Sequence, residues 1–212
     1  MAPEQLLLNL PVRPAMDAAD FVVSASNRDA VAWLDRWPDW PGSAIAIYGP
    51  PGCGKTHLAH VWQTRSKARF IDAGIGSSLP GDLNLVLDAV RPPEEELFHL
   101  INHIRTKRGA LLILDREAPA RWPVRLPDLA SRLASIPAIA VEPPDDALLA
   151  AILAKHFSDR QILVRPEVIA YLTRQIERSF AAAEAAVAAL DRAAMAQGAP
   201  ISVKLAREVL SR

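Results

Sequence analysis

Cysteine, net charge and long apolar runs are all scarce in this chain. Cys53 is the only cysteine, which excludes an internal disulfide and suits a reducing compartment. Lysine plus arginine and aspartate plus glutamate number 24 each, so no net positive charge favours direct binding to DNA or to an anionic membrane. No apolar stretch reaches the length of a transmembrane helix, and Glu4 and the short leucine run at 6–8 do not suit a signal peptide. We therefore expect a cytoplasmic protein without a membrane partner, whose contacts with DNA are only indirect.

The most specific pattern present is G-x-x-x-x-G-K-T, which directly follows the apolar stretch 44–48 and precedes a helical one. Its glycines let several backbone N–H groups point at one anion, and the Lys55 ammonium adds positive charge at the β- and γ-phosphates. Thr56 can coordinate Mg²⁺, and the helix that begins there presents the positive end of its dipole to the same phosphates. Cys53 is interpreted as filling space inside the loop. The motif consists of Gly49, Pro50, Pro51, Gly52, Cys53, Gly54, Lys55 and Thr56. We therefore predict a site for ATP or ADP with Mg²⁺.

The order of apolar and helical patterns predicts an α/β fold up to residue 141. Buried strands alternate with helices, which is typical of a parallel sheet covered by helices on both faces. Trp33 and Trp37, spaced by four, are expected to pack one helix onto this sheet. The strands are expected at 44–48, 68–72, 83–88, 110–114 and 136–141, with a helix from 92 that Gly109 closes.

Beyond Pro143 and Pro144 the pattern becomes entirely helical. The 212 residues, 50% of them hydrophobic, are enough for one medium domain and a smaller one. Helices are expected at 145–158, 166–178, 180–196 and 202–211. We therefore predict an extended N-terminal peptide at 1–14, an α/β nucleotide-binding domain at 15–144 and a small all-helical domain at 145–212.

A phosphate loop of this kind works with a second carboxylate, which holds Mg²⁺ at the end of a neighbouring strand. Asp88 and Asp115 each end an apolar stretch and both qualify. Asp88 is favoured, because a later strand then remains for a residue that senses the γ-phosphate, whereas Asp115 would leave no long strand after it. Ala89 follows Asp88, at the place where a hydrolytic enzyme usually has Glu or Asp to orient water. We therefore expect slow hydrolysis by the protein alone.

These motifs resemble those of AAA+ ATPases of the DnaA branch, and within that branch the group of DnaA-inactivating homologues called Hda or HdaA. The resemblance covers essentially the whole chain. Residues 21–30 are similar to the family stretch F-V-V-G-x-S-N-x-x-A, which implies that Val22 and Asn27 lie beside adenine. Residues 49–56 and 85–88 resemble its Walker A and Walker B motifs. The resemblance thus implies an AAA+ fold whose lid is the helical part.

Residues 126–133 resemble the family box that bears the arginine finger, which would be Arg132. Two other family features are changed. Asp115 is the only polar residue that fits the family position of the residue that senses the γ-phosphate. The lid arginine is replaced by the stretch 180–183, Phe-Ala-Ala-Ala, with Arg178 just outside it. These departures favour nucleotide binding over turnover.

The N-terminal stretch 5–10, Q-L-L-L-N-L, is similar to the sliding-clamp-binding peptide Q-L-x-L-x-L of the same group. A short free segment can lie extended in an apolar groove, with alternate leucines in its pockets. The expected anchors are Gln5, Leu6, Leu8 and Leu10. Packing of this stretch on its own domain is the competing interpretation.

The resemblance implies a negative regulator of replication initiation, tethered to the DNA polymerase sliding clamp. Arg132 would then act on the ATP held by DnaA and promote its hydrolysis; a homo-oligomer is compatible with this role. Two alternatives are a small-molecule P-loop kinase and a helicase-loader-like AAA+ protein. A kinase needs an arginine-rich lid to shield phosphoryl transfer, which the alanine-rich stretch 181–196 does not provide. A loader would have no use for a clamp peptide.

Overall fold

A computed structural model describes residues 22–71 and 84–211 of the chain. The described residues form two compact units, one of residues 27–142 and the other of residues 143–211 together with 22–26. The predicted clamp-binding anchors lie outside the described residues. No helix in the two described ranges has the length and apolar character required to cross a bilayer.

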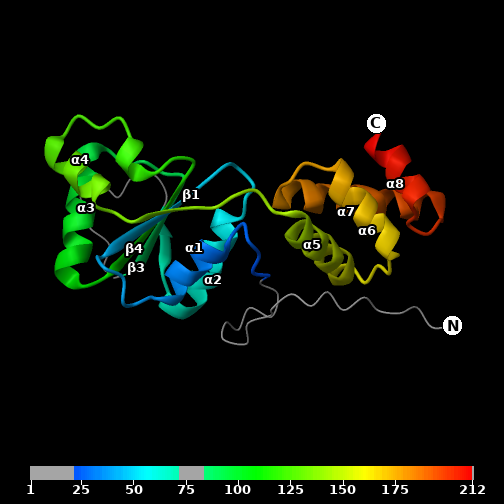
Figure 1. The fold of residues 1–212 in the computed structure, drawn as a ribbon, viewed down its shortest axis with the longest axis horizontal. Coiled ribbons are helices and arrows are strands. Elements are labelled where there is room, and N and C mark those ends of the chain that lie inside the picture. Colours follow the sequence, from blue (N-terminus) through cyan, green and yellow to red (C-terminus); the bar gives the residue numbers. More distant parts are fainter. Residues whose placement is uncertain (1–21, 72–83, 212) are drawn as a thin grey trace. The chain divides into compact units, whose positions relative to one another are not determined.

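The unit of residues 27–142 contains a five-stranded sheet in the order β2-β3-β4-β1-β5 (Figure 1). Every neighbouring pair is parallel, so all the strands end at the same edge of the sheet. Across that edge, Tyr48 pairs with Asp115, and Asp88 pairs with Leu114. The strands are β1 (Ala44–Tyr48), β2 (Arg69–Ile71), β3 (Asn84–Asp88), β4 (Ala110–Asp115) and β5 (Ala138–Ala140). The predicted parallel α/β sheet is confirmed, with each strand within two residues of its expected bounds where it is described.

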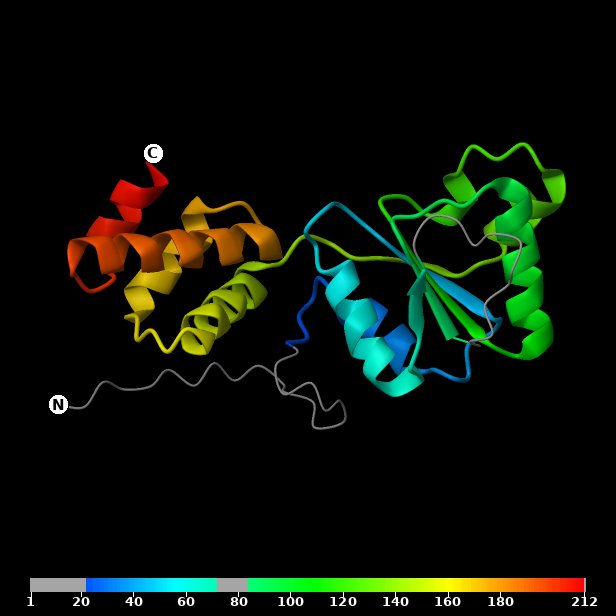
Figure 2. The ribbon, with the colours of Figure 1, turned by 180° about the vertical axis from the view of Figure 1, so that it is seen from behind.

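Helices cover both faces of this sheet. Figures 1 and 2 show α3 and α4 on the opposite side of the sheet from α1 and α2. The helices are α1 (Arg28–Asp35), α2 (Lys55–Ser66), α3 (Glu94–Lys107) and α4 (Pro127–Ala134), with a 3₁₀ turn, η1 (Pro119–Arg121), before α4. The first turn of α3 carries three glutamates and its last turn two basic residues, which favours the helix through its dipole.

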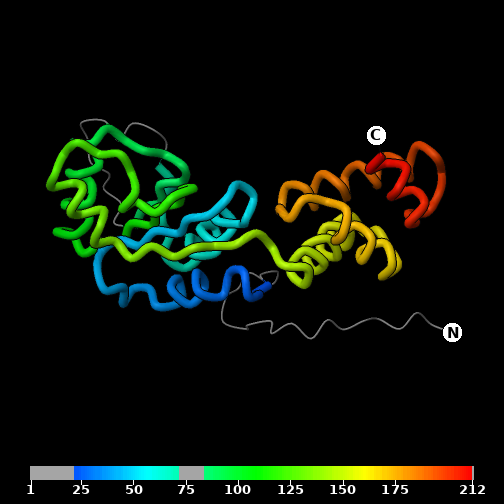
Figure 3. Tube along the Cα trace, turned by 45° about the horizontal axis from the view of Figure 1, so that its top comes forward, coloured from blue at the N-terminus to red at the C-terminus, as the bar shows by residue number. Residues whose placement is uncertain are grey.

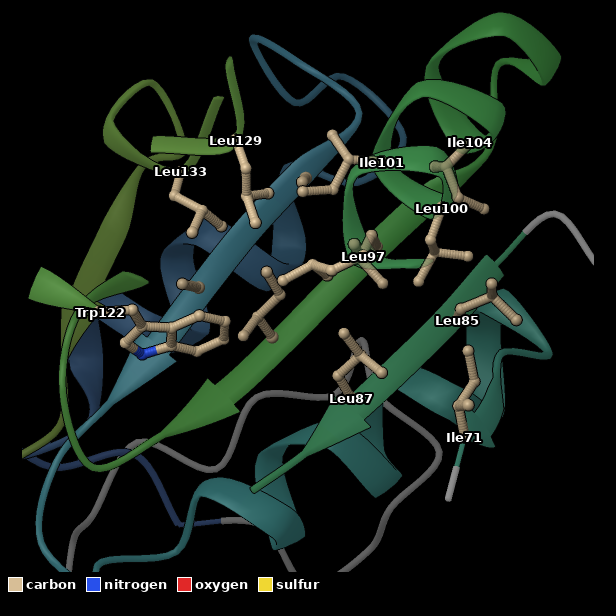
Figure 4. Packing of buried hydrophobic residues seen from close by; sticks show 14 residues of the cluster. Ile71, Leu85, Leu87, Leu97, Leu100, Ile101, Ile104, Trp122, Leu129 and Leu133 are labelled. Atoms are coloured by element: carbon tan, nitrogen blue, oxygen red, sulfur yellow. The ribbon is translucent and has the colours of Figure 1, made fainter. Parts of the chain in front are cut away.

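The strands bury alternate side chains on the two faces, as a period of two requires. Leu85, Leu87, Leu111 and Ile113 belong to the apolar core beneath α3 and α4 (Figure 4). Full burial of one such leucine is worth about 1.5–3 kcal/mol. The even-numbered residues of β3 and β4 therefore face α1 and α2. This alternation decides where the two aspartates at the strand ends point.

The predicted shared helix for Trp33 and Trp37 is wrong. Helix α1 ends at Asp35, and Trp37 lies in the turn that follows. Trp37 precedes a proline, a position at which the α conformation is sterically disfavoured. Its ring instead meets the edge of Trp62 at 6.0 Å between centroids, and Trp40 stacks on Trp62 at 5.2 Å. The tryptophans thus join the α1–β1 connection to α2.

The second unit contains four helices, as the sequence predicts (Figure 3). Three begin with a side-chain cap, in which Asp145, Ser179 and Ser202 each accept a hydrogen bond from a backbone N–H three residues later. The alanine-rich helix ends at Gly198, whose φ of 60° is the left-handed conformation of a helix C-cap. The helices are α5 (Asp146–Asp159), α6 (Pro166–Gln175), α7 (Phe180–Gln197) and α8 (Val203–Leu210). Helix α6 ends three residues before its predicted bound.

Candidate nucleotide-binding site

The G-x-x-x-x-G-K-T motif forms the loop between β1 and α2, and its glycines are sterically required. Gly52 and Gly54 have φ values of 73° and 100°, which side-chain-bearing residues rarely adopt. A Cβ at Gly49 would stand 2.2 Å from the carbonyl oxygen of Val141 and 3.1 Å from Sγ of Cys53. The loop therefore packs closely against the residue that follows β5, with no space for a side chain at Gly49.

The Lys55 side chain folds back against the phosphate loop to which it belongs. Its Nζ donates hydrogen bonds to the carbonyl oxygens of Gly49 (2.8 Å) and Pro50 (2.9 Å), and it lies 3.7 Å from Sγ of Cys53. Burial raises the pKa of the Cys53 thiol, although the nearby Lys55 charge acts in the opposite direction. Cys53 is accordingly a buried neutral thiol, in keeping with a space-filling role.

Thr56 and Asp88 meet beside this loop. The Thr56 hydroxyl donates to Oδ2 of Asp88 at 2.7 Å, although the two residues are 32 positions apart. Asp88 ends β3 at an even-numbered position and therefore points to the α2 side of the sheet. A hydroxyl and a carboxylate are hard oxygen donors of the kind that Mg²⁺ selects, with phosphate and water completing its shell. Within the described ranges no cluster of three or more His, Cys, Asp or Glu could hold a metal by itself.

Asp115 is held on the opposite face. It occupies an odd-numbered position of β4, like Leu111 and Ile113, and its side chain is buried. Both of its oxygens accept from Arg91, from Nε and from Nη2, each at 2.9 Å. Burial alone would raise the pKa of Asp115, but these bonds and those from the N–H groups of Arg116 (2.5 Å) and Glu117 (3.3 Å) lower it. Asp115 is therefore an ionised partner of Arg91, directed away from Thr56.

Ala89, directly after Asp88, has a left-handed backbone. Its φ is 53°, and its N–H donates to the carbonyl of Leu114 at 2.9 Å. For a residue with a Cβ this conformation costs roughly 1–2 kcal/mol. The chain thus leaves the sheet immediately after Asp88, and no carboxylate follows it.

The other predicted site residues lie on separate elements. Arg132 is in the last turn of α4, half-buried, and its guanidinium makes no hydrogen bond or ion pair with residues 22–71 or 84–211. Arg178, in the helical unit, pairs with Asp146 of the same unit at 2.7 Å. Val22 packs against the core of the helical unit, whereas Asn27 is buried at the start of α1 in the other unit. The structure therefore brings the phosphate loop and Asp88 together within the unit of residues 27–142.

Two residues that the sequence analysis did not single out also stand near the strand ends. Arg91, which pairs with Asp115, also lies over the ring of Trp122, 4.7 Å from its centroid. Glu94 accepts hydrogen bonds from the backbone N–H groups of Arg125 and Leu126. Neither contact has a local signal in the sequence, because the partners are more than 20 positions apart.

The chain is similar to DnaA proteins in both sequence and fold. No model of a known protein family matches it. It is 24% identical over 232 residues to the chromosomal replication initiator protein DnaA of Cutibacterium acnes; the match covers 94% of this chain and 46% of that relative. The chain thus spans about half the length of the curated relative that it matches.

Solved structures of DnaA share the arrangement. Domain III of the Thermotoga maritima replication initiation protein DnaA superposes with a TM-score of 0.72 at 18% identity, over 95% of this chain and 98% of that domain. The AMPPCP-bound DnaA of Aquifex aeolicus gives a TM-score of 0.66 at 18% identity, over 81% of this chain and 63% of that structure. The chain therefore has the AAA+ fold of DnaA domain III, a parallel sheet flanked by helices and followed by a helical region.

Proposed function

We propose that the protein binds ADP or ATP with Mg²⁺ between the phosphate loop and Asp88. The observation that carries this proposal is the 2.7 Å contact of Thr56 with Asp88, beside a loop whose lysine is already turned inward. The bound AMPPCP in the related Aquifex structure supports a nucleotide as the ligand. Asp88 rather than Asp115 is the metal-binding carboxylate, because Asp115 points to the other face and is neutralised by Arg91.

Each residue of this site has a distinct task. The backbone N–H groups of the non-proline residues of the loop 49–56 bind phosphate oxygens, and Lys55 supplies a positive charge to them. Thr56 and Asp88 would hold the metal ion, which when bound would neutralise negative charge on the phosphates. The position directly after Asp88 is Ala89, whose methyl side chain cannot orient a water molecule and whose backbone is left-handed. The protein on its own is therefore a nucleotide-binding protein with slow hydrolysis.

We further propose that the protein regulates replication initiation by acting on nucleotide held by DnaA. The fold of DnaA domain III supports a partner of the same architecture. Two features of Arg132 support the role of arginine finger. No described residue of its own chain forms an ion pair with its guanidinium, and its backbone belongs to the last turn of α4. A guanidinium inserted next to a transferring phosphoryl group stabilises the charge that develops there. In the same proposal Gln5, Leu6, Leu8 and Leu10 bind the sliding clamp.

The experiment that tests the finger role follows the ATP-to-ADP ratio on DnaA in the presence of clamp-loaded DNA. Wild type should accelerate the conversion, and Arg132→Ala should reduce the stimulated rate by about 10³-fold or more. Arg121→Ala, which removes an exposed arginine of η1, is the matched control and should stimulate like wild type. Full stimulation by Arg132→Ala would refute the finger assignment, and Arg125→Ala would then be tested next.

A further inference from the structure

The segment between β4 and α4 is hydrogen-bonded at two points to residues that follow β3, one in the β3–α3 loop and one at the start of α3. Nearer β4, Arg91 reaches from the β3–α3 loop to bind Asp115 with two bonds and to cover the ring of Trp122. Nearer α4, Glu94 binds the last two N–H groups before the helix. Arg91 and Glu94, which make these contacts, both lie within six positions of Asp88. The first residue of α3, six positions after Asp88, therefore bonds to the start of the helix that bears Arg132.

The contact of Glu94 is well suited to fix a helix. The N–H of Arg125 donates to both carboxylate oxygens at 3.0 Å, and the N–H of Leu126 donates to Oε2 at 2.8 Å. Leu126 is the N-cap of α4 and makes no side-chain cap of its own, so Glu94 provides the acceptor from another element. The hydrogen bonds from these two N–H groups lower the pKa of Glu94, which keeps it charged. A carboxylate here also complements the positive dipole ends of both α3 and α4.

The packing around this segment contains a small cavity. A cavity of about 130 Å³ lies between Arg91 and Glu94, and Leu97, Val124 and Leu129 are among the other residues that line it. The indole Nε1 of Trp122 is buried there without a hydrogen-bond partner among the described residues. Where apolar contacts are incomplete, the directional bonds from Arg91 and Glu94 determine where the segment sits.

We propose that Glu94 and Arg91 are positioning residues for Arg132, which set the place of α4 relative to the strand that ends in Asp88. This inference depends on the finger role proposed above for Arg132. Arg91 lies in the loop after Asp88 and Glu94 is the first residue of α3, so both connect the end of β3 to the start of α4. Neither residue contacts the partner's phosphates; each acts through α4.

The test replaces Glu94 and measures two quantities in the DnaA hydrolysis assay. Glu94→Ala should lower the maximal stimulated rate by about 10- to 100-fold, the loss expected for a catalytic group displaced by about 1 Å. The concentration that gives half-maximal stimulation should stay within about twofold, because no partner-binding group is removed. Glu94→Gln, which retains one carbonyl oxygen as acceptor, should recover most of the rate. Glu95→Ala removes an exposed carboxylate of the same turn and should behave like wild type.

Amide hydrogen exchange measures directly how strongly Glu94 protects the two N–H groups that it binds. The amides of Arg125 and Leu126 should exchange faster in Glu94→Ala than in wild type and Glu95→Ala, while tryptophan fluorescence shows that the unit remains folded. Wild-type stimulation by Glu94→Ala, with Arg132→Ala inactive, would overturn the positioning role and leave the finger role standing. Equal loss in both rate and half-maximal concentration would also overturn it, since Glu94 would then act in partner binding. If Arg132→Ala stimulates fully, both proposals are refuted together.

Discussion

Replacing Asp115 by Asn tests whether the Asp115–Arg91 pair stabilises the unit of residues 27–142. The asparagine keeps one acceptor oxygen but presents an N–H₂ group where Asp115 now receives a guanidinium donor. Hydrogen bonds to a charged group are worth about 1.5–3 kcal/mol each, and breaking a buried ion pair costs about 3–5 kcal/mol. The Arg91 side chain is 41% exposed, however, so water can solvate the guanidinium that is left behind. We therefore expect a loss of about 2 kcal/mol in the free energy of unfolding.

Urea unfolding followed by tryptophan fluorescence measures this loss in the relevant unit alone. All five tryptophans, Trp33, Trp37, Trp40, Trp62 and Trp122, belong to residues 27–142. With a typical slope of about 1–3 kcal/mol per molar urea, the midpoint should fall by roughly 1 M. Asp39→Asn, which changes an exposed carboxylate of the same unit in the same way, should leave the midpoint unchanged.

The pH dependence of the difference provides the second readout. The folded-state pKa of Asp115 is lowered, so its stabilising contribution is complete above the unfolded value of about 3.9 and is lost as the pH falls through the folded value. The gap between wild type and Asp115→Asn should therefore be constant from about pH 7 to pH 5 and shrink below about pH 4. A gap under about 0.5 kcal/mol at pH 7, or one that grows in acid, would show that the Asp115–Arg91 pair does not stabilise this unit.

Three further changes give clear expectations. Lys55→Ala removes the charge that faces the phosphates and should abolish ADP and ATP binding in calorimetry, with the circular dichroism spectrum unchanged; retained affinity would contradict the site. Ala89→Gly relieves a φ of 53° and should raise the free energy of unfolding by about 0.5–1 kcal/mol, whereas a loss of stability would show that the conformation is unstrained. Leu6→Ala together with Leu8→Ala should remove capture by the sliding clamp and leave the melting temperature unchanged; unaltered capture would exclude this stretch as the clamp-binding peptide.

Local features of this protein follow from the sequence because local chemistry determines them. The phosphate loop needs glycine at positions of positive φ, and the strands are short apolar runs that only a doubly covered sheet can bury. The caps of α5, α7 and α8 are Asp145, Ser179 and Ser202, residue types that favour the N-cap and that stand at the starts of the predicted helices.

Long-range polar pairs could not be predicted in this way. Glu94 lies in a first helical turn with two other glutamates, where the helix dipole already accounts for its charge. Nothing in that pattern reveals that Glu94 bonds to residues 31 and 32 positions later. The opposite orientations of Asp88 and Asp115 could have been predicted from the sequence. Side chains alternate between the two faces of a sheet, so the register of β3 with β4 determines the face to which each aspartate points.

The assignment of the metal-binding carboxylate is tested most directly by comparing ADP binding of Asp88→Asn and Asp115→Asn, with Mg²⁺ and with EDTA. Thr56 and Asp88 are proposed to hold the metal, whereas Asp115 is bound to Arg91 on the other face of the sheet. In wild type Mg²⁺ should strengthen binding, and Asp88→Asn should reduce this gain by at least about tenfold. Asp115→Asn should keep the wild-type gain. Loss of the gain in Asp115→Asn, with Asp88→Asn unaffected, would contradict the assignment of the site.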